Sequence, residues 1–415
     1  MNSNDIMALG LGLAAPWRIV GQHLNIERIP SVLHLAIEGE RGALYPCPIC
    51  GKLCKAHDYH EFSWRHLNFF QHHCIITAKI PRVDCLEHGT HRITVPWARD
   101  GSRFTLLFEQ VILLLAREMP VNAVSKYVGV TDKRIWRIIQ YYVFKALKLV
   151  NLDGLRSIGL DETATKRGHH YVTIFVDMDR ETRPVIFATP GKGKETLRAF
   201  ASYIKQHGSN VDNVIEIVCD MSPAFLSGAA ETFPNASITV DWFHVVQLFT
   251  KAVDEVRRLE AKVCKLPKGC RWAVLKNLEN SRTEKQESAL RELRERGLAT
   301  ATAFRIKELL RWVREAENSR AAKWRFSRFL TFANELLGEN KLLEPVQKAL
   351  RTCHAHMAHI LRRWDSMLTN ARLESLNGLF QAARSRAKGY RNVTTFITII
   401  YLIAAPIQGL LGEQG

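Results

Sequence analysis

The chain has 415 residues, with 58 Lys and Arg against 41 Asp and Glu, which gives a formal net charge of +17. Its hydrophobic fraction of 47% and charged fraction of 24% are those of a globular protein, so wholesale disorder and fibrous classes are excluded. The length predicts two or three domains, and the positive charge predicts a polyanionic partner, most simply nucleic acid.

Neither end of the chain has the pattern of a signal peptide or a membrane span. The amino-terminal apolar run has no basic residues before it. The most apolar late stretch, residues 396–411, is interrupted by Pro406 and Gln408, so we expect a buried helix there. These features predict a soluble, cytoplasmic, DNA-associated protein whose 9 cysteines are thiols or metal ligands, not disulfides.

Residues 1–100 are predicted to form a strand-rich module that binds one structural Zn²⁺. The pairs Cys47-x-x-Cys50 and Cys85-x-x-His88, each followed by glycine, supply four ligands of the type and spacing that tetrahedral zinc requires. A redox-active Cys-x-x-Cys among ordinary buried cysteines is the alternative. The side chains that could replace one ligand are Cys54, Cys74, His72 and His73.

Residues 101–150 are predicted to form a helix-turn-helix DNA-binding domain. We expect a first helix over residues 104–118, punctuated by Pro120, and a sharp turn at Gly129 between the next two helices. Plain helical packing produces the same spacing and is the alternative. The residues expected on the exposed side of the last helix, where they would meet a DNA groove, are Lys133, Arg134, Trp136, Arg137 and Gln140.

From residue 151 the pattern changes to that of a mixed α/β sheet of the ribonuclease-H-like kind. The expected strands cover residues 158–162, 171–177, 184–188, 214–220 and 237–241, with helices over 194–206 and 224–232. Asp161 and Asp220 are each expected to close a strand, where open sheets present ligand sites. Two carboxylates there can hold Mg²⁺, and a third would complete a two-metal site.

Glu374 is the best candidate for the third carboxylate. Read as a helix, its segment places Glu374, Asn377 and Gln381 on one polar stripe, separate from an apolar face. The pattern alone leaves a solvated glutamate as an equal alternative, just as a strand-terminal aspartate can simply cap the next helix. Glu162 and Asp241 compete for the same role.

Residues 250–365 are charged and predicted to be helical throughout. Trp272, Trp312, Trp324 and Trp364 alternate there with Arg and Lys, and we expect most of these tryptophans to be core residues among solvated charges. The basic faces could also follow a DNA backbone. Better phosphate-contact candidates follow the Glu374 segment: Arg384, Arg386, Lys388 and Arg391.

The order of these parts resembles the ISL-three family of bacterial insertion-sequence transposases over nearly the whole chain. The matching motifs are CPICG with its later CxxH, the helix-turn-helix, GLDETATKRGHHYVTIFVD, VCDMSPAF, FPNASITVDWFHVV and TNARLESLNGLFQAARSRAKGYRNVTTF. The resemblance implies a DDE transposase whose catalytic domain has two parts, residues 151–249 and 366–415, separated by an all-helical insertion at 250–365. Two positions depart from the family pattern: the second zinc pair ends in His88, and Gln381 stands where lysine is common.

The resemblance also implies how the site works. Asp161, Asp220 and Glu374 would hold two catalytic Mg²⁺ ions, and Asp241-x-x-His244 would be an auxiliary motif. His244 either orients a group near the metals or forms a hydrogen bond within the fold. The implied activity is Mg²⁺-dependent cleavage and strand transfer at terminal inverted repeats, by a homodimer or larger assembly. The alternatives are a zinc and helix-turn-helix regulator with an inactive ribonuclease-H-like domain, and a structure-selective DNA nuclease.

Overall fold

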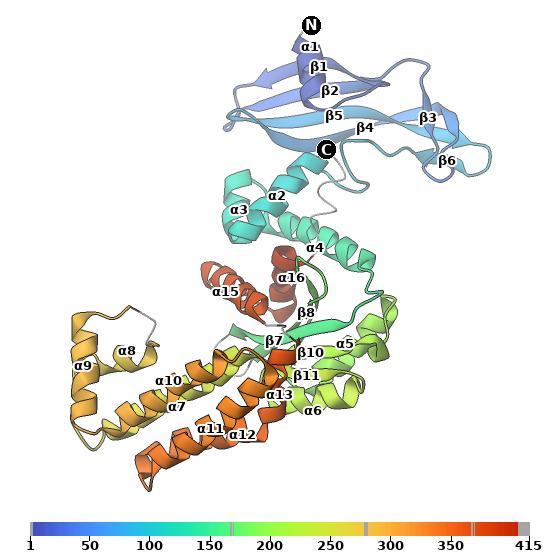
Figure 1. The fold of residues 1–415 in the computed structure, drawn as a ribbon. Coiled ribbons are helices and arrows are strands. Elements are labelled where there is room, and N and C mark those ends of the chain that lie inside the picture. Colours follow the sequence, from blue (N-terminus) through green and yellow to red (C-terminus); the bar gives the residue numbers. More distant parts are fainter. Residues whose placement is uncertain are drawn as a thin grey trace. The chain divides into compact units, whose positions relative to one another are not determined.

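The computed structural model describes residues 3–166, 168, 170–277, 281–366, 368 and 370–405. The chain folds into two compact units, with the boundary between Tyr142 and Val143 (Figure 1). Each unit has its own hydrophobic core. Within the described ranges, no helix has the length and apolar character needed to cross a membrane.

The first unit begins with a six-stranded sheet that follows one short helix. Its order is β1–β2–β5–β4–β3, and β6 pairs with β5. Every second side chain of β5 enters the core, where Ile76, Ala78 and Ile80 meet Trp17 and Trp64. The predicted strand-rich module is therefore observed. The elements are helix α1 (Ser3–Gly10) and strands β1 (Trp17–Asn25), β2 (Val32–Gly39), β3 (Leu44–Pro46), β4 (Leu53–Phe69), β5 (His72–Cys85) and β6 (Gly89–Arg92).

Three helices follow the sheet and confirm the predicted helix-turn-helix: α2 (Leu106–Glu118), α3 (Val121–Val128) and α4 (Asp132–Leu149). Helix α2 begins slightly later than expected because the Thr105 hydroxyl accepts a hydrogen bond from the Phe108 N–H and caps it. Gly129 ends α3 in the left-handed region, with φ of 68°, which makes the sharp turn possible. Ile135 and Ile138 are buried beside Val124.

The second unit contains the five-stranded mixed sheet, in the order β11–β10–β7–β8–β9. Strands β7, β8 and β9 form an antiparallel meander, and β10 and β11 add parallel strands beside β7. This is the predicted ribonuclease-H-like arrangement. The elements are β7 (Ser157–Lys166), β8 (His170–Asp177), β9 (Val185–Pro190), α5 (Lys194–Gln206), η1 (Val211–Asn213), β10 (Glu216–Cys219), α6 (Pro223–Thr232) and β11 (Ser237–Val240).

Asp161 lies in the middle of β7, so the expectation that it closes a strand is wrong. The strand continues because residues as far as Lys166 pair with β8, up to His170. On the other side, β10 pairs with β7 only up to Gly159. Asp161 therefore lies just beyond the carboxyl end of β10, close to where Asp220 follows that strand.

The predicted helical region is also observed. Helix α7 is joined to α10 by Glu260, a buried carboxylate that accepts hydrogen bonds from the N–H groups of Ala299 (2.6 Å) and Thr300 (2.9 Å). The helices are α7 (Trp242–Glu260), α8 (Cys270–Leu275), α9 (Glu284–Glu295), α10 (Ala299–Arg314), α11 (Ser319–Leu337), η2 (Lys341–Leu343), α12 (Glu344–Ala355), α13 (Met357–Leu361) and α14 (Arg363–Ser366).

The tryptophans of this region are not mainly core residues, which corrects the expectation from the sequence. Trp272, Trp312 and Trp324 are 57%, 37% and 58% exposed, and Trp364 is half-buried. Their spacing among charged residues reflects a surface, since the helix cores are filled by Leu, Ala and Phe side chains.

Two helices return to the sheet: α15 (Ala371–Arg386) packs on β7, and α16 (Val393–Ala404) packs on β9. A Cβ atom on Gly159 of β7 would lie 2.8 Å from Asn370 Oδ1 and 3.1 Å from Leu373 Cδ1, so glycine permits the close approach of α15. Helix α16 is buried as predicted; Pro406 and Gln408 lie outside the described residues.

Candidate functional site

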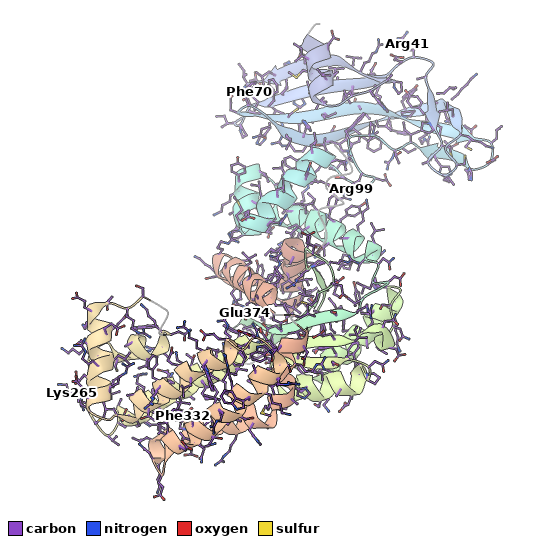
Figure 2. The ribbon with its side chains drawn as sticks, viewed as in Figure 1. Arg41, Phe70, Arg99, Lys265, Phe332 and Glu374 are labelled. Atoms are coloured by element: carbon purple, nitrogen blue, oxygen red, sulfur yellow. The ribbon has the colours of Figure 1, made fainter. Side chains whose placement is uncertain are left out.

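Five carboxylates from β7, α7, α15 and the end of β10 gather at one edge of the mixed sheet. Asp161 is electrostatically coupled to Asp220 and to Asp241, which immediately precedes α7. Glu374, in the first turn of α15, is coupled to Asp241 and Asp161, while Glu162 is coupled to Asp220. Figure 2 shows Glu374 on α15 beside the sheet. We call these five residues the acid cluster.

The acid cluster holds excess negative charge. Burial, together with neighbouring carboxylates, raises the pKa of Asp161, and it raises the pKa of both Glu162 and Glu374 to about 7. Among the residues that the structure describes, no Lys or Arg forms an ion pair with any of the five carboxylates. Lys192 and Arg363 act on Glu162 and Asp241 by electrostatic attraction without such an ion pair. Carboxyl pKa values raised by burial and by like charge are typical of a functional site.

Helix α15 orients Asp161 directly. Asn377 Nδ2 donates a hydrogen bond to Asp161 Oδ2 (2.8 Å), and Asp161 Oδ1 accepts one from the Glu162 N–H (2.8 Å). One turn further, Gln381 Nε2 donates to Thr163 Oγ1 (2.6 Å) and to a β7 carbonyl. The polar stripe predicted for this helix therefore faces β7, and Gln381 anchors it there.

Other side chains at this edge of the sheet still have polar atoms that are free to form hydrogen bonds. Asp220 Oδ1 accepts a hydrogen bond from the Ser222 N–H (2.8 Å), so Asp220 also has the capping role that was its alternative interpretation. Its second carboxylate oxygen is still available as an acceptor. Asp241 Oδ2, His244 Nε2 and Asn377 Oδ1 are buried and have no hydrogen-bond partner within the described ranges. Buried polar atoms are rarely left unpaired, so this edge is shaped for polar contents that the chain itself does not supply.

The donor set of the acid cluster fits a hard divalent cation, since carboxylate and amide oxygens are the ligands that Mg²⁺ prefers. The carboxylate oxygens of the acid cluster lie farther apart than the ligand atoms of one compact metal site. Only Cys47, Cys50, Cys85 and His88, among the described residues, form a group of three or more ligand side chains with all ligand atoms within 4.8 Å of one another.

The four predicted zinc ligands meet at the end of the first sheet. Sγ of Cys47 lies 3.9 Å from Nδ1 of His88, Sγ of Cys50 lies 3.8 Å from Sγ of Cys85, and Cys85 Sγ lies 3.5 Å from His88 Nδ1. Bonds of about 2.3 Å to sulfur and 2.0 Å to nitrogen give ligand separations of this size around tetrahedral zinc. The side chain of His88 and the backbone lower the pKa of Cys85 to about 6, which favours the metal-binding thiolate.

Each ligand pair lies in a turn between antiparallel strands, β3–β4 and β5–β6, and glycines in the left-handed region follow both pairs: Gly51 with φ of 73° and Gly89 with φ of 74°. The alternative ligands are placed elsewhere or less well. Cys54 is near the group but its Sγ donates to the Lys52 carbonyl, and Cys74 is buried in a separate cluster. The ring of His72 contacts the Ser31 hydroxyl.

Helix α4 exposes most of the residues predicted to meet DNA. Lys133, Arg134, Arg137 and Gln140 are exposed, and Trp136 is half-buried. The Arg134 guanidinium lies 4.5 Å from the centroid of the Phe104 ring, so it is held by a cation–π contact.

The four basic residues predicted after Glu374 differ in their exposure to solvent. Arg386, Lys388 and Arg391 are exposed, whereas Arg384 is half-buried and donates to the Ala164 carbonyl (2.9 Å). Arg384 therefore also anchors α15 to β7. The contacts of these four side chains with phosphate stay a prediction.

Sequence reasoning missed two residues that position the cluster. Asn370, fully buried before α15, donates from Nδ2 to the carbonyls of Leu160 (3.3 Å) and Val218 (3.5 Å), and so ties the helix start to β7 and β10. Gly159 provides the space for that contact. A lone Asn before a helix and a lone Gly in a strand have many ordinary explanations, so neither gave a usable signal.

Comparisons with known proteins agree with this architecture. A family model for the ISL3 transposase, described as "Transposase", matches residues 158–400, and a model of the "Helix-turn-helix domain of transposase family ISL3" matches residues 93–143. A model of the "zinc-finger of transposase IS204/IS1001/IS1096/IS1165" matches residues 44–88.

Two curated relatives resemble the chain over most of its length. The transposase for insertion sequence element IS1557 of Mycobacterium tuberculosis is 25% identical over 390 residues, which cover 86% of this chain and 85% of the relative. The transposase for insertion sequence element IS1001 of Bordetella parapertussis is 24% identical over 372 residues, which cover 84% of this chain and 86% of the relative.

Proposed function

Because the chain belongs to the ISL3 (ISL-three) family of DDE transposases, we propose that it binds the terminal inverted repeats of an insertion sequence and catalyses Mg²⁺-dependent strand cleavage and strand transfer there. The observation that carries this proposal is the gathering of Asp161, Asp220 and Glu374 from three distant segments at one sheet edge. It explains why carboxylates are concentrated there although, among the described residues, none of them forms an ion pair with Lys or Arg.

In this proposal Asp161, Asp220 and Glu374 hold two Mg²⁺ ions. When bound, the ions activate the attacking hydroxyl and stabilise the leaving 3′ oxygen during in-line displacement at phosphorus. Asn377 fixes the carboxylate plane of Asp161 through its hydrogen bond. Asp241, beside Glu374, adds negative charge and a second acceptor that helps to attract cations.

We assign His244 a positioning role at the same edge. Its Nε2 is buried, lacks a partner within the described ranges, and is electrostatically coupled to Asp161. A ring nitrogen with these surroundings can hydrogen bond to a water molecule or phosphate oxygen held between the carboxylates.

Recognition of the repeats is assigned to the amino-terminal parts. The zinc module of residues 1–100 and the helix-turn-helix of 101–150 would read DNA, with Lys133, Arg134, Trp136, Arg137 and Gln140 in a groove. Residues 151–249 and 366–415 would form the catalytic domain around the insertion of 250–365, and Arg384, Arg386, Lys388 and Arg391 would contact phosphates near the acids. Joining needs both repeat ends together, so we expect a homodimer or larger assembly on DNA.

The test uses pre-cleaved DNA ends made from the inverted repeats that bracket the coding region, with a target plasmid and Mg²⁺. Asp161→Asn, Asp220→Asn and Glu374→Gln should each abolish strand joining while leaving repeat binding intact, and the exposed Glu339→Gln should behave as the wild type. Joining that survives Asp220→Asn undiminished would refute the scheme. Cutting of Holliday junctions without joining of repeat ends would instead support a nuclease.

A further inference from the structure

Helix α11 carries an exposed line of alternating basic and aromatic side chains. Arg320, Trp324, Arg328 and Phe332 are all exposed and follow one another at intervals of four residues. Residues four apart lie about 6 Å apart along one side of a helix. We call these four residues the α11 stripe. The opposite side of the helix, with Phe326 and Phe329, enters the core.

The neighbouring helix α10 holds both aromatic members in place. Trp312 is 37% exposed, and its ring lies 5.7 Å from that of Trp324 in an edge-to-face arrangement. The Arg305 guanidinium lies 5.5 Å from the Phe332 ring centroid. The aromatic rings are therefore pre-positioned, although Trp324 is 58% exposed and gains little from the core.

The charge around the stripe is positive. Helix α11 has one acid, Glu335, against four basic residues, which are Arg320, Lys323, Arg325 and Arg328. Of the acids on α10 and between α10 and α11, Glu308 pairs with Lys307 (2.8 Å) and Glu315 with Arg311 (2.8 Å), while Glu317 is exposed. The surface therefore favours a polyanion that also presents flat apolar faces.

The α11 stripe begins at the end of α11 that lies nearer to the acid cluster. Trp364 Nε1 donates to the Ala316 carbonyl (2.8 Å) just before α11, and the Trp364 ring lies 5.6 Å from that of Trp242, which follows Asp241. Arg363 is electrostatically coupled to Asp241 and to Arg314, at the end of α10. Phe332, labelled in Figure 2 on the insertion helices, marks the far end of the stripe.

Building on the function proposed above, we propose that the α11 stripe binds an unpaired DNA strand leaving the acid cluster. Trp324 and Phe332 each stack on a base, and Arg320 and Arg328 contact the intervening phosphates. Aromatic side chains interleaved with cations are how proteins bind single strands without sequence preference. Duplex DNA hides its base faces, so the aromatic members select unpaired nucleotides, such as those exposed when the strands separate at a cut end beside the acids.

The test measures binding of the full chain to a fluorescently labelled thymidine oligonucleotide by anisotropy, in buffer without added Mg²⁺ or chelator, so that no cleavage occurs and zinc stays bound. Trp324→Ala should weaken single-strand binding roughly tenfold, the order expected for one lost stacked base, and Trp324→Phe should restore most of it. Trp272→Ala is the matched control, since Trp272 is 57% exposed and lies against Arg271 but belongs to α8. Binding to a duplex inverted repeat should be equal in all four proteins.

Single-strand affinity that is the same in Trp324→Ala and in the wild type would overturn the proposal. So would a Trp324→Ala protein that loses self-association in sedimentation while keeping its single-strand affinity, because the stripe would then be an interface between copies. Failure of the proposed function is seen separately, as wild-type protein that does not join repeat ends with Mg²⁺, whatever the binding results without Mg²⁺.

Discussion

Replacing Glu374 by glutamine should stabilise the metal-free protein. The surrounding carboxylates and burial raise the pKa of Glu374 from 4.5 to about 7. A raised carboxyl pKa means that ionising the group costs folding free energy. That cost is absent below pH 4.5, grows between pH 4.5 and 7, and is complete above pH 7. Glutamine removes the charge and can still donate a hydrogen bond to Asp241.

The expected gain follows from the size of that shift. A pKa difference of this size corresponds to about 3 kcal/mol at pH 8. Because Glu374 is only half-buried, solvent screens the repulsion, and we expect about 1–2 kcal/mol. For a unit of this size that raises the melting temperature by about 2–4 °C per kcal/mol.

Scanning calorimetry without added Mg²⁺ at pH 8 and pH 5 measures the effect. Glu374→Gln should melt higher than the wild type at pH 8 and close to it at pH 5, and the exposed control Glu339→Gln should match the wild type at both. With Mg²⁺ at pH 8 the difference in melting temperature between Glu374→Gln and the wild type should shrink or change sign, because only the wild type keeps all three proposed ligands. A variant that is less stable than the wild type at pH 8 without Mg²⁺ would show that Glu374 does not share the repulsion assigned to it.

Four further outcomes are expected. Cys85→Ser should contain no bound zinc in metal analysis, and its amino-terminal unit should lose several kcal/mol of stability because the zinc-binding free energy is lost. Cys264→Ser, far along the chain, should keep zinc; retention of zinc by Cys85→Ser would contradict the ligand set. Arg137→Ala should weaken repeat binding: for all sequences, with the salt dependence lowered by about one counterion, if Arg137 contacts phosphate, and at one base pair only if it reads a base. The exposed Lys205→Ala on α5, outside the parts assigned to repeat recognition, should change neither; titrations at several salt concentrations decide. The apparent affinity for Mg²⁺ or Mn²⁺, followed by metal-dependent stabilisation, should fall as the pH drops below about 7, because protons compete with the metal for Glu374. An affinity that does not change between pH 8 and pH 5.5 would argue against Glu374 as a ligand. Gly159→Ala should lower the free energy of unfolding by about 1–3 kcal/mol, because the added Cβ forces α15 away from β7. Gly378→Ala within α15 should raise it by up to about 1 kcal/mol, because its added Cβ meets no atom within 4 Å. Equal melting curves for the two variants would refute the close-approach argument.

Local features of this protein could be predicted from the order of its residues. The ligand pairs at Cys47 and Cys85 depend on spacings of three residues within single turns, and the turn at Gly129 depends on one left-handed residue. Strand and helix periodicity likewise predicted the mixed sheet and the helical insertion. Such features depend on neighbours in the chain, so the pattern of residue types is enough to predict them.

Which distant groups meet could be seen only in the folded chain. Pairing of β7 with β8 placed Asp161 in mid-strand, and the hydrogen bonds of Asn370 and Asn377 brought Glu374 to it. Packing of α10 against α11 also left Trp324 at the surface, although its sequence pattern is equally that of a core residue. Each result depends on contacts between segments far apart in the chain, whose geometry is set by the packing of the whole unit and leaves no periodic trace in the residues themselves.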